Sequence, residues 1–133
     1  MSFQNKSMSI KSFVQNTLGC TCPDTIFDRQ EIENGITISG VENCVKLCIG
    51  EKLLIYLVTI EKINNLSTPI TSILSEGRKE RDSRHLNRFR LVLVANDVEA
   101  ISDDAHMVFN SIDDLDDKVH LHILSARECE MLL

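Results

Sequence analysis

The chain has few residues of the kinds that build extended or membrane-spanning proteins. It has no tryptophan, one tyrosine, two prolines and five glycines among 133 residues, which excludes a collagen-like or proline-rich disordered chain. No apolar run approaches the roughly 20 residues that a membrane helix needs. The amino terminus, MSFQNKSMSIK, lacks the apolar core of a signal peptide. We therefore expect no association with a membrane.

The sequence motifs of several common enzyme classes are also missing. The chain has no Walker loop, no Gly-x-Gly-x-x-Gly after a strand, no Gly-x-Ser-x-Gly elbow and no His-Glu-x-x-His. No sequence motif therefore supports nucleotide hydrolysis, dinucleotide binding or the common hydrolase reactions. Whether the protein is an enzyme stays open. A net charge of −6 argues against a dedicated nucleic-acid binder.

What is present is the composition of an ordinary globular protein. Hydrophobic residues make up 43% and charged residues 26% of the chain, and the length predicts one domain over residues 1–133. The chain has five cysteines, an odd number. Together with the missing export signal, that count favours a reducing compartment, the cytoplasm, over a disulfide framework.

Hydrophobic periodicity in the first half of the chain predicts a helix followed by a β-hairpin. Apolar residues at helical spacing predict a helix over residues 10–18, which Gly19 ends in the left-handed conformation. Strict alternation predicts a strand over residues 44–49. The apolar run LLIYLVTI, residues 53–60, predicts a central strand buried on both faces. Gly50-Glu51 fits a two-residue hairpin turn between them.

The second half of the chain has a β-α-β-α-β pattern. Ser67-Thr68-Pro69 is a helix start signal, and strands are predicted over residues 91–95 and 119–124. An apolar stripe over residues 98–112 predicts a helix between these strands, which Asn96 or Asp97 can cap. Ser125 and Glu128 have the spacing of a capping box. Strands linked through helices run parallel. We therefore expect an α/β fold with one mixed sheet, in which an antiparallel hairpin continues into a parallel part, and with helices on both faces.

Ligands of open α/β sheets gather at the carboxyl ends of the parallel strands. In this chain those ends carry Asn64 and Asn65, Asn96 and Asp97, and Ser125. We expect at most a polar cleft there.

The cysteine pair in Cys20-Thr21-Cys22-Pro23 is the feature that points most directly to chemistry. Two thiols this close can share a metal, form a disulfide, or act as an attacking thiol and its resolving partner. Cys20 follows a predicted helix end, whose dipole disfavours a thiolate. Cys22 is predicted to cap a short helix beginning at Pro23, where unpaired N–H groups favour a thiolate. This predicts Cys22 as the attacking thiol, and the alternative is that both residues pack in a tight turn.

The stretch FVQNTLGCTCPDTIF, Phe13–Phe27, resembles a family of small, functionally uncharacterised prokaryotic proteins. These proteins share a Leu-Gly-Cys-x-Cys-Pro segment near the amino terminus with an aromatic residue shortly after it. The positions that match are Leu18, Gly19, Cys20, Cys22, Pro23 and Phe27. The resemblance implies that the cysteine pair matters and implies no mechanism.

Cys44 and Cys48 are predicted to pack in the sheet. On a strand, residues four apart point the same way but lie about 13 Å apart, too far to share one metal. A structural zinc usually needs four ligands, and Cys-x-Cys with Cys-x-x-x-Cys is not a standard zinc spacing. Zinc or an iron–sulfur cluster at Cys20 and Cys22 is therefore left open without further support.

His120 and His122 share one face of the last predicted strand. A His-x-His pair on a strand can present two imidazoles to one metal or substrate. The alternative is the polar face of an edge strand, and no third ligand is obvious.

The charges are segregated along the chain. Six bases lie in the segment Arg78–Arg90, whereas eight acids and no base lie between Asp97 and Asp117. The basic segment could hold an anion, since arginine suits bidentate contacts. The alternatives are a solvated helix face with pairs such as Glu80 with Arg84, and a homodimer with basic against acidic faces.

Three hypotheses follow from these patterns. The most specific is a thiol-based redox or metal-binding role through Cys20 and Cys22. The second is a non-catalytic interaction module, homodimeric, whose cysteines are structural. The third is binding of an anion or nucleic acid through Arg78–Arg90.

Overall fold

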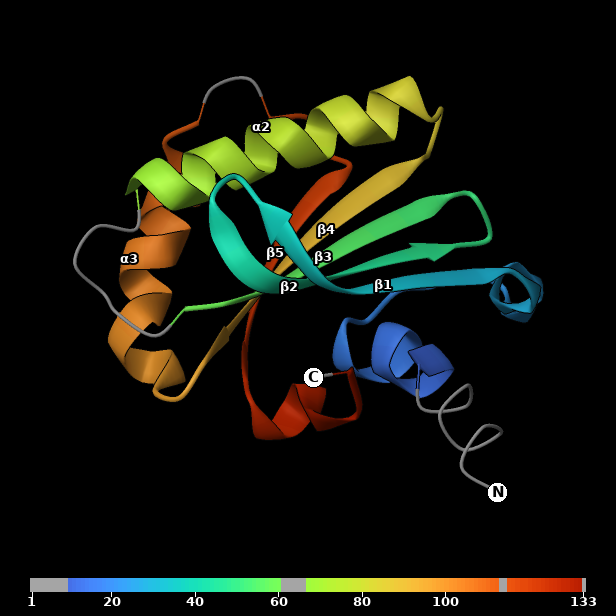
Figure 1. Ribbon diagram of the computed structural model, residues 1–133, viewed down its shortest axis with the longest axis horizontal. Helices are drawn as coiled ribbons and strands as arrows, with labels where there is room; N and C mark the ends of the chain where they lie inside the picture. Colours follow the sequence, from blue (N-terminus) through green and yellow to red (C-terminus); the bar gives the residue numbers. More distant parts are fainter. Residues whose placement is uncertain (1–9, 61–66, 113–114, 133) are drawn as a thin grey trace.

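The computed structural model describes residues 10–60, 67–112 and 115–132. Figure 1 shows one five-stranded sheet between two layers of helical segments. None of the helices in the described ranges is long and apolar enough to cross a bilayer. In chain order the elements are η1 (Phe13–Thr17), η2 (Asp24–Asp28), β1 (Gln30–Ile38), β2 (Val41–Ile49), β3 (Leu53–Thr59), α2 (Ser67–Ser83), β4 (Arg88–Ala95), α3 (Val98–Asn110), β5 (Val119–Ser125) and η3 (Arg127–Leu132).

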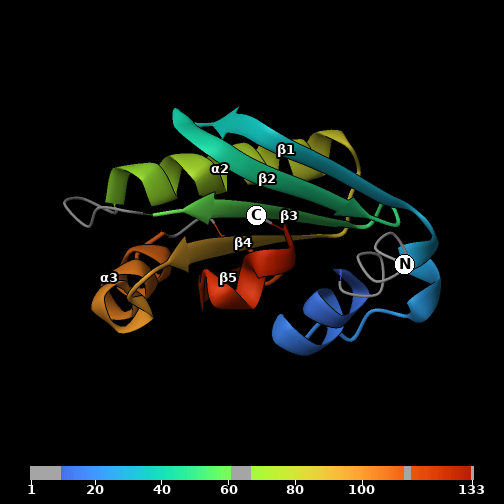
Figure 2. The same cartoon turned by 60° about the horizontal axis from the view of Figure 1, so that its bottom comes forward.

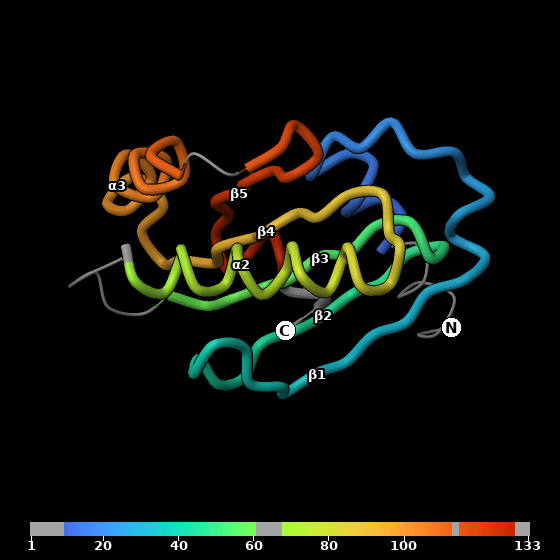
Figure 3. The backbone as a smooth tube through the Cα atoms, turned by 90° about the horizontal axis from the view of Figure 1, so that it is seen from above, coloured from blue at the N-terminus to red at the C-terminus, as the bar shows by residue number. Residues whose placement is uncertain are grey.

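The strands lie in the sheet in their chain order, β1-β2-β3-β4-β5. Neighbours among β1, β2 and β3 run antiparallel. β3, β4 and β5 run parallel because α2 and α3 return the chain to the same end of the sheet. Figure 3 shows β1 and β5 at opposite edges. The predicted mixed sheet is therefore confirmed.

The helices α2 and α3 cover one face of the sheet. Ile70 of α2 and Ile101 of α3 pack there with Tyr56 and Phe89 of the central strands, and all four side chains are buried. Gly77 brings α2 unusually close to the sheet, because a Cβ atom at this position would lie 2.1 Å from the Phe89 ring. The hydrophobic stripes read from the sequence thus form this half of the core.

The opposite face is covered by short helical segments from near the two chain ends, as Figure 2 shows. Ile10, Phe13 and Val14 of the N-terminal segment pack against this face, where Val92 of β4 is buried. Cys129 of η3 joins the same cluster. Helices on both faces were predicted, and this is confirmed, with only short turns on this second face.

Backbone angles and hydrogen bonds confirm several predicted helix ends. Gly19 ends the N-terminal helical segment with a left-handed φ of 72°. The Asp97 side chain accepts a hydrogen bond from the Ala100 N–H and caps α3. Ser125 and Glu128 bond each other reciprocally, as a capping box requires.

The turn between β2 and β3 is longer than predicted. Ile49 pairs with Leu53, and the Lys52 N–H donates to the Ile49 carbonyl at 3.0 Å. The turn therefore holds three residues, 50–52, instead of two. Gly50 and Glu51 both have positive φ, 59° and 55°, and the chain needs one more residue to re-enter the sheet.

Candidate functional site

Cys20 and Cys22 form a disulfide in the structure. Their Cα atoms lie 5.3 Å apart, within the usual range for bonded cysteines. The pair lies in the segment between η1 and η2, and both residues are partly exposed. Of the forms that the Cys-x-Cys spacing allows, the structure has the disulfide, so neither sulfur is a free thiolate ligand in this state.

Hydrogen bonds to the preceding helical turn hold this disulfide loop in place. The Cys20 N–H donates to the Val14 carbonyl at 3.1 Å, just after the left-handed Gly19. The Gln15 side-chain amide donates to the Cys22 carbonyl at 3.1 Å. The local sequence therefore fixes the loop to the helix that precedes it.

The prediction that Cys22 caps a helix is wrong. Pro23 is the residue before η2 and has extended backbone, with φ −67° and ψ 151°. The 3₁₀ helix η2 consequently begins one residue later, at Asp24. Cys22 lies outside this helix, and the electrostatics of a helix start do not single it out from Cys20.

The disulfide lines a pocket of about 190 Å³ at the end of the sheet where β3 and β4 begin. In Figure 1 the N-terminal segment, drawn in blue, lies beneath this end. Residues 20–23 form one wall of the pocket. The others are formed by Ile26, Lys52, Leu53, Asn87 and Arg88. The ionisable side chains among these lining residues, apart from the cysteines, are the cations Lys52 and Arg88. Their field favours thiolates over thiols when the disulfide is reduced.

Main-chain contacts hold the walls of this pocket together. The Lys52 carbonyl accepts from the N–H groups of Asn87 at 2.7 Å and Arg88 at 3.0 Å, which joins the start of β4 to the β2–β3 turn. The turn also lies close to η2. A Cβ atom on Gly50 would lie 2.6 Å from the Ile26 Cβ. Residues far apart in the sequence are thus held around the disulfide by backbone geometry.

The pocket lies at the opposite end of the sheet from the cleft considered in the sequence. Asn96 and Asp97 follow β4, and Ser125 ends β5, so these residues lie at the carboxyl ends of the parallel strands. Asn64 and Asn65 lie outside the described residues. The disulfide loop, in contrast, packs near the amino ends of β3 and β4.

Two arginines of β4 lie next to the two histidines of β5. Arg88 Nη1 lies 3.4 Å from the Nε2 atom of His120, and Arg90 Nη1 lies 2.8 Å from that of His122. Arg90 Nη1 also donates to the Leu18 carbonyl at 3.2 Å, which ties β4 to the chain just before the disulfide. Burial and the charge of Arg90 lower the pKa of His122 to about 4 and also lower the pKa of His120. Both rings are therefore neutral at pH 7 and can accept these contacts.

His120 and His122 share one face of β5, as predicted, because each ring contacts an arginine on the same face of β4. β5 is an edge strand. Among the residues that the structure describes, no three His, Cys, Asp or Glu side chains gather in a cluster suited to a metal ion. Guanidinium groups against both Nε2 atoms also disfavour a metal cation there. Metal binding by Cys20 and Cys22 stays a prediction for their reduced form.

The other three cysteines are free and buried. Cys44 and Cys48 pack between β2 and α2, as predicted, and Cys129 packs on the opposite face. Burial raises the pKa of all three thiols, to about 11 for Cys129. A high pKa and burial make these thiols poor nucleophiles. Of the five cysteines, only Cys20 and Cys22 are therefore partly exposed.

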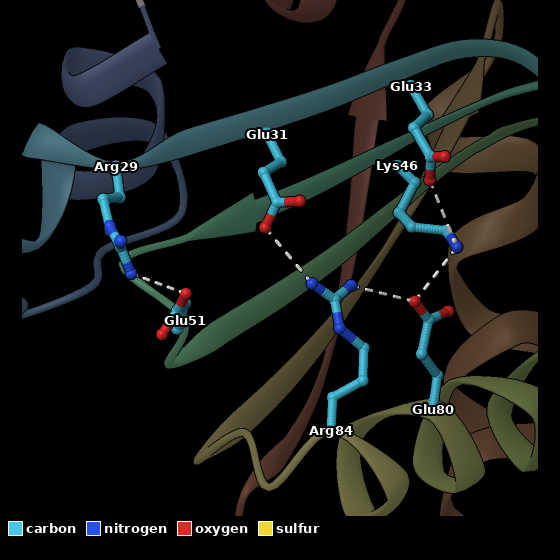
Figure 4. Close-up of polar contacts among 7 residues, drawn as sticks. All are labelled: Arg29, Glu31, Glu33, Lys46, Glu51, Glu80 and Arg84. Carbon is cyan, nitrogen blue, oxygen red and sulfur yellow. Dashed lines mark hydrogen bonds and ion pairs between the residues drawn. The ribbon is translucent and has the colours of Figure 1, made fainter.

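The basic segment Arg78–Arg90 is divided between two faces of the protein. Figure 4 shows Arg84, one residue after the end of α2, which contacts Glu80 of α2 at 3.1 Å and Glu31 of β1 at 3.2 Å. Lys46 of β2 contacts the same Glu80 at 3.0 Å. The predicted pair of Glu80 with Arg84 is therefore confirmed, and it belongs to a network that joins α2 to β1 and β2.

The positive charge of Arg81 is also balanced within the chain. Its Nη2 atom lies 2.7 Å from the carboxylate of Asp116, which belongs to the acid-rich stretch between Asp97 and Asp117. Arg88 and Arg90 differ, because β4 begins at Arg88 and carries both side chains to the other face. No carboxylate within the described ranges forms an ion pair with either of them. The segment is thus not one helix face.

Comparison with known proteins identifies no relative: no family model, no curated protein and no solved structure matches the chain. The function therefore has to be argued from the site itself.

Sequence reasoning did not find Lys52 or Asn87 as residues of the pocket. They come from a hairpin turn and from a connection between helix and strand, and neither has a local signal. A signal for the arginine–histidine cluster does exist. The alternations Arg88-Phe89-Arg90 and His120-Leu121-His122 each place two polar side chains on one face of a strand.

Proposed function

We propose that this protein is a thiol–disulfide redox protein that cycles Cys20 and Cys22 between the disulfide and the dithiol. One observation carries the proposal: the bonded pair is partly exposed and lines a pocket whose other ionisable groups are Lys52 and Arg88. Cations beside a cysteine lower its thiol pKa, which helps a sulfur to leave during reduction and to attack during oxidation.

The reaction exchanges one disulfide for another. The thiolate of a small thiol attacks one of the two cysteine sulfurs, and the electron pair of the S–S bond leaves with the other sulfur, which takes a proton. A second thiolate then attacks the substrate sulfur of this mixed disulfide. The released cysteine sulfur takes the second proton, and the two substrate sulfurs leave joined as a disulfide. Cys20 and Cys22 gain two electrons and two protons, and the substrate loses them.

The free state of the other three cysteines supports a cytoplasmic setting for this chemistry. Cys44, Cys48 and Cys129 are free thiols in the structure. Free thiols persist in reducing compartments, where the disulfides that do form are mostly transient and catalytic. We therefore place the proposed cycle in the cytoplasm.

The test counts and titrates the thiols of the native protein. The oxidised protein should show no rapidly alkylated cysteine, and mild reduction with dithiothreitol should expose two, assigned to Cys20 and Cys22 by peptide mass mapping. The pH dependence of iodoacetamide alkylation should give at least one of these thiols a pKa below the reference of about 8.5. The variant Arg88→Gln should raise that pKa, because it removes one neighbouring cation.

A control and two outcomes make this test decisive. Arg78→Gln removes an equal charge from α2, on the other face of the sheet, and should leave the thiol pKa unchanged. A disulfide that is reduced only when the protein unfolds would contradict the redox proposal and assign Cys20 and Cys22 a structural role. Thiols that titrate at or above the reference value in the folded protein would contradict it as well.

A further inference from the structure

Arg90 is a buried cation that pairs with no carboxylate among the residues that the structure describes. It is 8% exposed, close to the 6% of Arg81. Arg81 lies 2.7 Å from Asp116, whereas the contacts of Arg90 in the described part of the chain are the Leu18 carbonyl and the His122 ring. Burying a charge is unfavourable unless an opposite charge compensates it. Arg81 has such a neighbouring carboxylate, whereas Arg90 has none within the described ranges.

The surroundings of Arg90 add positive charge instead of removing it. Arg88 lies two residues earlier on the same face of β4. Burial and the charge of Arg88 both lower the pKa of Arg90, and its Nε has no hydrogen-bond partner among the described residues. His122 is neutral at pH 7, so it orients Arg90 without balancing its charge. The described part of the chain therefore supplies no anion to this site.

The charge of Arg90 lies close to the disulfide pocket, which its neighbour Arg88 lines. Arg88 lines that pocket together with Lys52 and the side chains of Cys20 and Cys22. Arg90 bonds the carbonyl of Leu18, two residues before Cys20. An anion held by the two arginines would consequently lie next to the sulfur atoms that the proposed redox cycle uses.

The size of the pocket limits what this anion can belong to. About 190 Å³ equals the volume of about six liquid water molecules, which suits a small molecule and is too small for a folded partner's loop. Guanidinium groups match the planar fork of a carboxylate with two parallel hydrogen bonds. A small thiol with a carboxylate a few bonds from its sulfur would fill the pocket with both groups engaged.

We propose that Arg88 and Arg90 form an anion site that binds the carboxylate of a small thiol and so positions its sulfur against the Cys20–Cys22 disulfide. This inference rests on the proposed function and names the substrate class for it. The exchange itself is the one described above, with the carboxylate thiol as the reductant and its own disulfide as the product.

The first test compares three reductants of matched size and different charge: 3-mercaptopropionate, 2-mercaptoethanol and cysteamine. Rates of reduction of the native protein are normalised to the thiolate concentration of each reagent and to its rate with a small uncharged disulfide, which corrects for both the ionised fraction and the intrinsic nucleophilicity of each thiol. The anionic reagent should react about tenfold faster than the neutral one, and the cationic reagent more slowly, as expected for a charged cleft. Added salt should reduce the difference.

Variants locate this charge preference. Arg88→Gln should remove most of the tenfold advantage of 3-mercaptopropionate while 2-mercaptoethanol still reduces the protein. Arg78→Gln, with the same loss of charge on α2, should keep the full advantage. Equal normalised rates for the three reagents on the native protein would overturn the inference. So would an unchanged preference in Arg88→Gln.

A second test does not depend on the redox reaction. The imidazole NMR signals of His120 and His122 are followed while the oxidised protein is titrated with succinate, with neutral succinamide and with inorganic phosphate. Succinate should move both signals, succinamide should not, and Arg88→Gln should weaken the response. No response to succinate, or a response to phosphate alone, would overturn the carboxylate site. If no thiol reduces the native disulfide but succinate still binds, the proposed function fails and the anion site stands.

Discussion

The substitution Gly77→Ala tests how tightly α2 is packed on the sheet. An alanine in the interior of an exposed helix is favoured over glycine by about 1 kcal/mol, so helix propensity alone predicts a more stable protein. The structure predicts the opposite. The new Cβ would lie 2.1, 2.3 and 2.6 Å from three carbon atoms of the Phe89 ring, against an ordinary contact distance of about 3.5 to 4 Å.

Neither α2 nor the ring has room to relieve this overlap. The Phe89 ring packs edge-on against Tyr56, with ring centres 4.9 Å apart. The Tyr56 hydroxyl in turn donates to Glu80, on the same helix as Gly77. Overpacking of a well-filled core costs about 1–3 kcal/mol and sometimes more. Because the overlap is severe, we take the upper end of this range, about 3 kcal/mol. After the gain in propensity of about 1 kcal/mol, we expect Gly77→Ala to lower the free energy of unfolding by about 2 kcal/mol.

Urea unfolding followed by circular dichroism measures this effect. With a typical slope, a loss of this size moves the midpoint down by about 1 M. The control Ser75→Ala is exposed on the same helix and should leave stability unchanged or raise it by a few tenths of a kcal/mol. If Gly77→Ala is as stable as the native protein, the close approach of α2 to Phe89 is refuted. Partial recovery in the double variant Gly77→Ala, Phe89→Leu would trace the cost to this contact.

Two further predictions concern charges on the two faces of the sheet. Glu80→Gln should lower the free energy of unfolding by about 2 kcal/mol, because it leaves Lys46 and Arg84 without their shared, largely buried carboxylate. A variant that unfolds in urea at pH 7 at the same midpoint as the native protein would contradict this. For His122 the folded-state pKa of about 4 lies below the unfolded value near 6.5, so the unfolded chain binds the extra proton between these values. The free energy of unfolding should therefore fall as the pH decreases from about 6.5 to about 4. His122→Gln should flatten this part of the curve of unfolding free energy against pH. An unchanged slope in that variant would show that burial and Arg90 do not hold the ring neutral.

Local sequence patterns determined most of the secondary structure of this protein. Alternation and helical periodicity depend on which face of an element is buried, and that information is present within about ten neighbouring residues. The strand 53–59, the cap at Asp97 and the left-handed Gly19 were readable for this reason. The burial of Cys44 and Cys48 followed from the hairpin, which pairs their strand with the apolar strand that begins at Leu53.

Local patterns were less reliable where one residue changes a turn. Gly50-Glu51 is compatible with hairpin turns of two and of three residues. In the three-residue turn of the structure, Gly50 lies against Ile26 of η2 and donates to the Arg29 carbonyl, contacts that the local sequence does not reveal. Pro23 fits both the first position of a helix and the position before it. The structure has the second arrangement, which removes the electrostatic distinction between Cys22 and Cys20.

Only the tertiary structure decided the surroundings of the cysteine pair. The sequence alone singled out Cys20 and Cys22 by their spacing, but Lys52 and Arg88 reach them through a turn and a strand start that lie far along the chain. The tertiary structure also separated Arg88 and Arg90 from the other bases of their segment. Arg81 of α2 and Arg84, one residue after it, meet acids across the fold. Arg88 and Arg90 instead face the disulfide loop, and no acid among the described residues pairs with them. Such pairing depends on which elements pack together, and this is a property of the whole chain, not of any segment.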